Sequence, residues 1–187
     1  FTKGQDDATF EAPAVEFTVN GADEYNVFPG DKRFAYNSAS LQSWLNNTNA
    51  GENIIYFADN IEGDVTVDQK EGHNVVIDGN YYEFAGTITI DGNSRYTDET
   101  VLIKNVNFVN NNDEEISFVE MNSTDGAVRY AHNVTIEACT FTGGKNSVAA
   151  KFRQSHNITI KDCAVVSGHS LAQFYGCENI LIEGTTV

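Results

Sequence analysis

Three segments toward the end of the chain repeat one pattern: HNVTIEACTF at residues 132–141, HNITIKDCAV at 156–165 and ENILIEGTTV at 178–187. Their asparagines, Asn133, Asn157 and Asn179, lie 24 and 22 residues apart. Each copy alternates apolar and polar residues as a β-strand does. A repeat length in the low twenties, with one strand in every copy, is typical of a solenoid whose coils bury their apolar faces on one another.

Two earlier segments extend this repeat: HNVVIDGNYY at 73–82 and ETVLIKNVNF at 99–108. Residues two apart on a strand share a face, so the aliphatic positions should point inward and stack from coil to coil. They are Val75, Ile77, Val101, Ile103, Val134, Ile136, Ile158, Ile160, Ile180 and Ile182. The next position points outward and alternates in charge: Asp78, Lys104, Glu137, Lys161 and Glu183. The sequence therefore predicts an all-β fold, a right-handed parallel β-helix of about five coils.

A short helix is expected to cover the start of the stack. Residues 40–45 place apolar side chains at helical spacing, and Ser38 or Ser40 can cap the helix. A lid of this kind would keep the first coil dry, with Trp44 in the core. We therefore divide the chain into two parts. They are an acidic extension at 1–37, with one or two short strands at 15–19 and 25–28, and a β-helix at 38–187 whose cap spans 38–47.

The other end of the stack has no comparable cover in the sequence. The last segment, residues 183–187, contains no amphipathic helix and no cluster of charges. Ile180, Ile182 and Val187 would then be exposed beside unpaired backbone groups, a hazard that repeat proteins normally avoid. We expect additional coils beyond Val187, self-association, or cover by another chain.

Composition restricts the partners. The 187 residues carry 27 acidic and 11 basic side chains, a formal charge of −16, which argues against nucleic acid or an anionic membrane as a partner. No apolar run reaches the ~18 residues that membrane insertion needs.

The three cysteines are an odd number. Cys139 and Cys163 share an inward position in successive coils and are expected as buried thiols, with a disulfide as the alternative and Cys177 free.

The amino-terminal coils carry the resemblance to a known family. Its residues are Leu41, Trp44, GENIIY at 51–56, VTV at 65–67 and NVVIDGN at 74–80. They resemble the parallel β-helix superfamily typified by pectate lyases, over roughly residues 38–187. The short sequences IDGN at 77–80 and IKNVNF at 103–108 also resemble sequences of adhesin-like surface proteins of bacteria and archaea. The resemblance implies a secreted or cell-surface protein, but the same coils serve lyases, glycosidases, phage tailspikes and non-catalytic adhesins.

The candidate site consists of outward residues on a second strand of the last coils. Lys151 and Arg153 should lie above Gln173 and Tyr175 and form a strip that can bind sugar. A lyase acting on a uronate polymer would hold Ca²⁺ with several carboxylates and use a basic residue as the general base. Arg153, Lys151 and Asp162 are the catalytic candidates, but Asp162 stacks between Ala138 and Gly184 rather than between acids.

Stacked His132 and His156 could bind a metal, but Glu178 fills the same position in the next coil, so we expect a polar turn position there and no metal site. We favour a non-catalytic β-helix module that contacts a polysaccharide or mediates adhesion, with no cofactor. The first alternative is a Ca²⁺-dependent polysaccharide lyase of which this chain is a part. A phage tailspike-like or fibre-like module is the second alternative.

Overall fold

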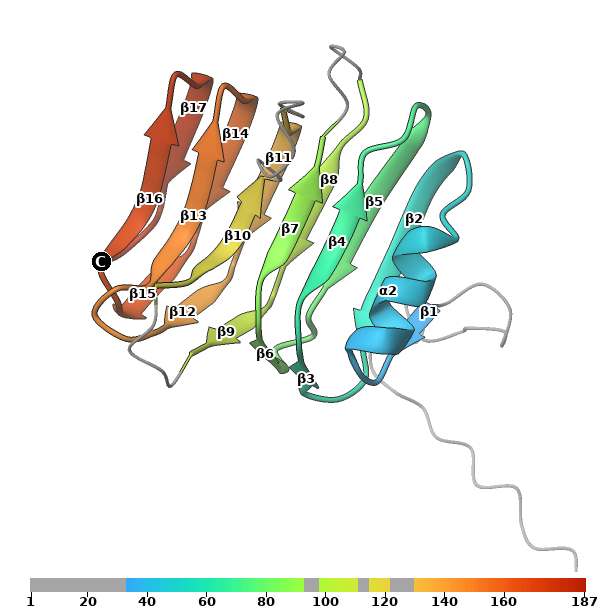
Figure 1. Ribbon diagram of the computed structural model, residues 1–187, viewed down its shortest axis with the longest axis horizontal. Coiled ribbons are helices and arrows are strands. Elements are labelled where there is room, and N and C mark those ends of the chain that lie inside the picture. Colours follow the sequence, from blue (N-terminus) through green and yellow to red (C-terminus); the bar gives the residue numbers. More distant parts are fainter. Residues whose placement is uncertain (1–32, 93–97, 111–114, 122–129) are drawn as a thin grey trace, which may run out of the picture. The chain divides into compact units, whose positions relative to one another are not determined.

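The computed structural model of the protein describes residues 33–92, 98–110, 115–121 and 130–187 (Figure 1). These residues belong to one compact unit of the chain, residues 32–187. The strands expected at 15–19 and 25–28 lie outside the described residues. Residues 110–115 and 122–126 make this coil longer than its neighbours, which predicts a protruding loop, and most of them also lie outside the described residues.

The strands form three parallel sheets, as expected for a β-helix. The first sheet contains, in spatial order, β1 (Arg33–Ala35), β2 (Gly51–Phe57), β5 (His73–Asp78), β8 (Val101–Lys104), β11 (His132–Glu137), β14 (His156–Lys161) and β17 (Glu178–Glu183). The second contains β3 (Ile61–Glu62), β6 (Glu83–Ala85), β9 (Asn107–Val109), β12 (Thr140–Thr142) and β15 (Ala164–Ser167). The third contains β4 (Val65–Asp68), β7 (Ile88–Asp91), β10 (Ser117–Met121), β13 (Val148–Arg153) and β16 (Ser170–Tyr175).

Each coil gives one strand to each sheet, in the order first, second, third. Within the described residues five coils carry all three strands and β17 begins another, so the helix has about six turns. Figure 1 shows the coils side by side, from the amino-terminal helix α2 (Ser38–Asn46) at one end to β16 and β17 at the other. The predicted fold class is thus confirmed, and β1 pairs with β2 upstream of the expected start of the β-helix.

The inward stacks of the first sheet follow the predicted register. Ile136 pairs with Ile103 on one side and with Ile160 on the other, and all three are buried. Ile180 and Ile182 continue the two stacks, but they are 38% and 46% exposed because no described coil covers them.

Aromatic side chains fill the interior beside the second sheet. Phe84, Phe108 and Phe141 come from successive coils, with ring centroids 5.8 and 5.0 Å apart, and Phe118 from the third sheet packs 5.6 Å from Phe108. This stack is not evident in the sequence, because strands of three residues show little periodicity.

The helix α2 covers the first coil, but two of its details differ from expectation. Its N-cap is Asn37 and not a serine: the Asn37 side chain accepts a hydrogen bond from the Ser40 amide at 2.8 Å. Ser40 Oγ accepts one from the Asn37 amide at 3.1 Å, which completes a capping box. Leu41 and Leu45 are buried, whereas Trp44 is 36% exposed and is not a core residue. Its indole lies over the sheet edge because Nε1 donates to the Phe34 carbonyl at 2.9 Å.

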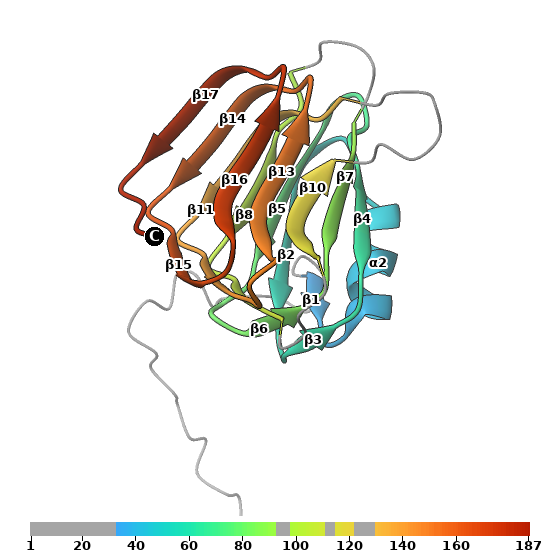
Figure 2. The ribbon, with the colours of Figure 1, turned by 60° about the vertical axis from the view of Figure 1, so that its left-hand side comes forward.

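The same helix closes the edge of the third sheet. Gln42 accepts a hydrogen bond from the Thr66 amide at 2.7 Å and donates to the Thr66 carbonyl at 2.9 Å. One side chain thus takes the place of a neighbouring strand along part of β4. In both ribbon views α2 lies against β4 (Figures 1 and 2).

The cysteines are free thiols, as expected. Cys139 and Cys163 are buried, and each sulfur contacts carbonyl oxygens of its own and the preceding coil. Cys177 is partly buried. Among the described residues no helix is both long enough and apolar enough to cross a membrane.

Candidate functional site

The outer face of the third sheet carries two parallel columns of polar side chains. Register pairs Thr66 with Thr89, Thr89 with Glu120, Glu120 with Lys151 and Lys151 with Gln173. A second column pairs Asp68 with Asp91 and, further along, Arg153 with Tyr175. Figure 2 shows the strands β4, β7, β10, β13 and β16 that carry these columns. Hydroxyl and acidic groups therefore occupy the end near α2, and basic and aromatic groups occupy the other end.

The structure brings together the four predicted binding residues, Lys151, Arg153, Gln173 and Tyr175, which we call the strip. The Arg153 guanidinium carbon lies 5.5 Å from the centre of the Tyr175 ring, a cation–π arrangement. The Tyr175 hydroxyl donates to Gln173 Oε1 at 3.1 Å. These contacts connect Arg153, Tyr175 and Gln173 on the outer face of the third sheet.

The residues of the strip form part of the lining of two hollows. The first, of about 70 Å³, is lined by Glu120, Met121, Lys151, Phe152, Arg153 and Tyr175. The second, of about 320 Å³, is lined by Glu115, Asn146, Val148, His169 and Gln173. Lys151 connects them, because its Nζ lies 3.6 Å from Glu115 Oε1 in the second hollow.

Glu120 lines the first hollow but was not among the candidate residues predicted from the sequence. Burial raises the pKa of this carboxyl, while the Lys151 ammonium and a hydrogen bond from Ser117 oppose the shift. The first hollow thus contains a carboxyl group, two cationic groups and an aromatic ring within one concave surface. Such a set can accept and donate hydrogen bonds to hydroxyl groups and can pack against the apolar face of a ring.

Asp162 does not join this group. It follows β14 at the corner between the first and second sheets, whereas the strip lies on the third sheet. Its carboxylate packs over Gly184, where an added Cβ would collide with it, and its φ of 53° places it in the left-handed region. We assign it a role in the turn rather than in the candidate site.

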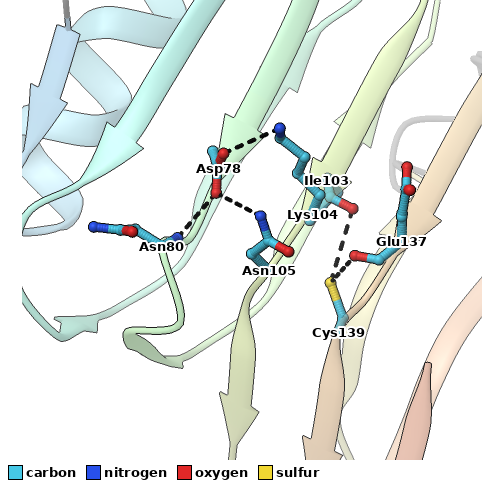
Figure 3. Close-up of polar contacts among 7 residues, drawn as sticks. All are labelled: Asp78, Asn80, Ile103, Lys104, Asn105, Glu137 and Cys139. Atoms are coloured by element: carbon cyan, nitrogen blue, oxygen red, sulfur yellow. Dashed lines mark hydrogen bonds and ion pairs between the residues drawn. The ribbon is translucent and has the colours of Figure 1, made fainter. Parts of the chain in front are cut away.

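The charge ladder on the first sheet is a structural feature, as predicted, and Figure 3 shows its pair of Asp78 and Lys104. Lys104 Nζ lies 3.1 Å from Asp78 Oδ2, and Lys161 Nζ lies 3.0 Å from Glu137 Oε1. Asp78 Oδ1 also accepts from the Asn80 amide and from Asn105 Nδ2, each at 3.0 Å. Burial lowers the pKa of Lys104, but the hydrogen bond and charge of Asp78 outweigh burial and raise it. These groups neutralise one another.

The asparagine column forms an amide ladder next to the histidines. Asn157 Nδ2 donates to Asn133 Oδ1 at 2.8 Å, and Asn179 Nδ2 donates to Asn157 Oδ1 at 3.0 Å. All three have φ between 53° and 59°, which asparagine tolerates better than most residues. The His132 and His156 ring centroids lie 5.1 Å apart with the rings tilted at 44°, and His156 Nδ1 lies 3.3 Å from Glu178 Oε2. Within the described residues, no three His, Cys, Asp or Glu side chains are arranged to hold a metal ion.

The buried His132 predicts sensitivity to acid. Burial lowers its pKa from the usual 6.5, and the neighbouring His156 lowers it further. The unfolded chain then binds a proton more readily than the folded protein, so stability is lost as the pH falls below about 6.5. Urea denaturation at pH 7.5 and 5.5 should show a smaller decrease in unfolding free energy for His132→Gln than for the unaltered protein. The exposed His169→Gln variant is the control, and an equal effect of both substitutions would contradict this assignment.

Comparisons with family models, with curated proteins and with solved structures found no match to this chain.

Proposed function

We propose that this β-helix is a non-catalytic module of a secreted or cell-surface protein and binds a polysaccharide chain along the outer face of its third sheet. The observation that carries the proposal is the first hollow, in which Glu120, Lys151, Arg153 and Tyr175 converge. The second hollow extends the surface along the same strands. An open and elongated polar surface of this kind suits an extended polymer better than a compact ligand.

The chemistry of the first hollow suits a sugar. Sugar hydroxyl groups need closely spaced donors and acceptors, which Lys151, Arg153 and Glu120 supply. The Tyr175 ring offers an apolar surface for the C–H face of a sugar ring. The cation–π contact with Arg153 and the hydrogen bond to Gln173 hold that ring in place, so little side-chain entropy is lost on binding.

The arrangement of the carboxylates favours binding of a polysaccharide without catalysis over a lyase reaction. A Ca²⁺-dependent lyase would need several carboxylates converging on one cation beside the basic residue. Of the described residues that line the first hollow, Glu120 is the one carboxylate, and Asp162 lies at a different corner of the coil. The strip therefore supports binding through Lys151 and Arg153.

A glycan array with neutral and uronate-containing polymers, probed with and without Ca²⁺, tests this proposal. We expect Tyr175→Ala and Arg153→Ala each to weaken binding by about three- to tenfold. Lys161→Ala on the first sheet is the matched control and should leave affinity unchanged. Absence of any bound glycan, or equal binding by all variants, would refute the proposal.

The same samples distinguish the enzymatic alternative. An unsaturated product that absorbs ultraviolet light, formed from a uronate polymer and lost in Arg153→Ala, would establish a lyase. That result would replace the non-catalytic proposal.

A further inference from the structure

One side-chain position at the corner between the first and second sheets holds cysteine in two successive coils. Cys139 lies directly before β12 and Cys163 directly before β15, and Thr140 in β12 pairs with Ala164 in β15. The Ala164 amide donates to the Cys139 carbonyl at 2.9 Å. Neighbouring parallel strands lie about 4.8 Å apart, which is within the ~4.4–6.8 Å that separates the Cα atoms of disulfide-linked cysteines.

The two sulfur atoms occupy equivalent places in their coils. Cys139 Sγ lies 3.3 Å from the carbonyl oxygen two residues before it, and Cys163 Sγ lies 3.2 Å from the corresponding oxygen of its own coil. Figure 3 shows the first of these contacts. Ala138 and Asp162, the residues directly before the cysteines, both adopt the left-handed region, with φ of 51° and 53°. The same turn therefore directs both thiols in the same way, one stacked on the other.

The surroundings give the two buried thiols different acidities. Burial raises the pKa of Cys139, and the neighbouring Cys163 thiol raises it further. A hydrogen bond with the Cys139 thiol lowers the pKa of Cys163 and outweighs the opposing effect of burial. The thiolate is the form that reacts with oxidants. Cys163 is therefore the thiol that reacts first, with a protonated Cys139 beside it.

We infer that Cys139 and Cys163 form a modification site for hydrogen peroxide, at which oxidation joins two successive coils through a disulfide. The Cys163 thiolate attacks one oxygen of the peroxide, the O–O bond breaks, and Cys163 becomes a sulfenic acid while hydroxide leaves. The Cys139 sulfur then attacks the Cys163 sulfur, the S–O bond breaks, and the hydroxyl group leaves with the Cys139 proton as water. The two thiols together lose two electrons and two protons, which reduce one peroxide to two molecules of water. This inference does not depend on glycan binding.

The rest of the column makes the pair specific. Val106 lies opposite Cys139 in the preceding coil, and Thr185 lies opposite Cys163 in the next. Cys177 lies at a different corner, between β16 and β17, where its counterpart in the preceding coil is Ser155. The length of β14 separates the two corners. Of the three cysteines, all of which the structure describes, the fold thus brings Cys139 and Cys163 to neighbouring positions and keeps Cys177 apart.

Mass spectrometry of the folded chain after treatment with hydrogen peroxide tests the inference. The protein carries Cys177→Ser, which removes the third thiol and introduces the residue type that Ser155 already provides in the preceding coil. We expect a mass lower by two hydrogen atoms, a digestion product in which positions 139 and 163 are linked, and recovery of both thiols with dithiothreitol. The cross-link joins residues 24 positions apart, so the oxidised chain should unfold at a higher urea concentration than the reduced chain.

Two variants in the Cys177→Ser background are the controls. Cys139→Val places in this column the residue type that Val106 already provides, and peroxide should then add oxygen to Cys163 without raising the urea midpoint. Cys163→Thr, for which Thr185 is the precedent, should leave Cys139 as an unreacted thiol and remains usable if the valine variant does not fold. Addition of oxygen instead of loss of hydrogen in the protein with both cysteines, disulfide-linked dimers, or two thiols that do not react would each overturn the inference.

Discussion

Replacing Phe108 with alanine is expected to lower the free energy of unfolding by about 3–5 kcal/mol, measured by urea denaturation. The Phe108 ring is fully buried and packs against Phe84, Phe118 and Phe141, with centroids 5.0 to 5.8 Å away. These neighbours belong to the coils on both sides and to the opposite sheet, so they cannot close the cavity without disturbing several strands. The loss of unfolding free energy would therefore include both the lost burial of the ring and the cost of the cavity that it leaves.

Two further variants make this prediction specific. Phe108→Leu keeps much of the volume and should cost less than alanine, so it remains measurable if the alanine variant does not fold. Phe34→Ala removes an exposed ring from β1 and should have a small effect. A loss below about 1 kcal/mol for Phe108→Ala would contradict the buried aromatic stack.

Replacing Ile160 with alanine is expected to cost about 2–5 kcal/mol. Ile160 is 1% exposed and lies between Ile136 in the preceding coil and Ile182 in the next. Coils above and below fix the space around it, so the site cannot collapse around the smaller side chain. The change should appear as a lower urea midpoint with little change in the slope of the transition.

The matched control for this variant is Ile182→Ala, in β17, the terminal strand of the first sheet. Ile182 occupies the same inward column but is nearly half exposed, so its truncation should cost much less. Equal losses at Ile160 and Ile182 would show that the two sites are equally buried and that the edge of β17 is covered.

The sequence was sufficient to predict the first sheet. Four of its strands, β5, β11, β14 and β17, have asparagine as their second residue. Two aliphatic columns follow at fixed positions, so Val134 and Ile158 could be aligned by counting. The charge ladder followed from the same register, because opposite charges on neighbouring parallel strands are favourable.

The second sheet and the amino-terminal cap could not be predicted in this way. The strand β3 has two residues and β9 has three, too few to show alternation. The position of Trp44 depends on a hydrogen bond to the Phe34 carbonyl, which is tertiary information absent from helical spacing. Asn37 was overlooked as the cap because the two serines after it have the same chemistry.

The candidate site was predictable in part for the same reason. Lys151 pairs with Gln173, and Arg153 with Tyr175, each 22 residues apart, which is the spacing of the repeat. Glu120 and Lys151 also pair, but they are 31 residues apart, so the repeat length does not align them. The place of the Glu120 carboxyl group in the lining of the hollow is therefore set by the tertiary structure.

The most direct test of the proposed function is a map of amide chemical shifts during titration with a glycan that binds on the array. We predict changes concentrated at Glu120, Lys151, Arg153, Gln173 and Tyr175, on β10, β13 and β16, with the outer face of the first sheet unaffected. Changes centred on the first-sheet ladder, at Asp78 and Lys104, with the third sheet unperturbed, would contradict the account.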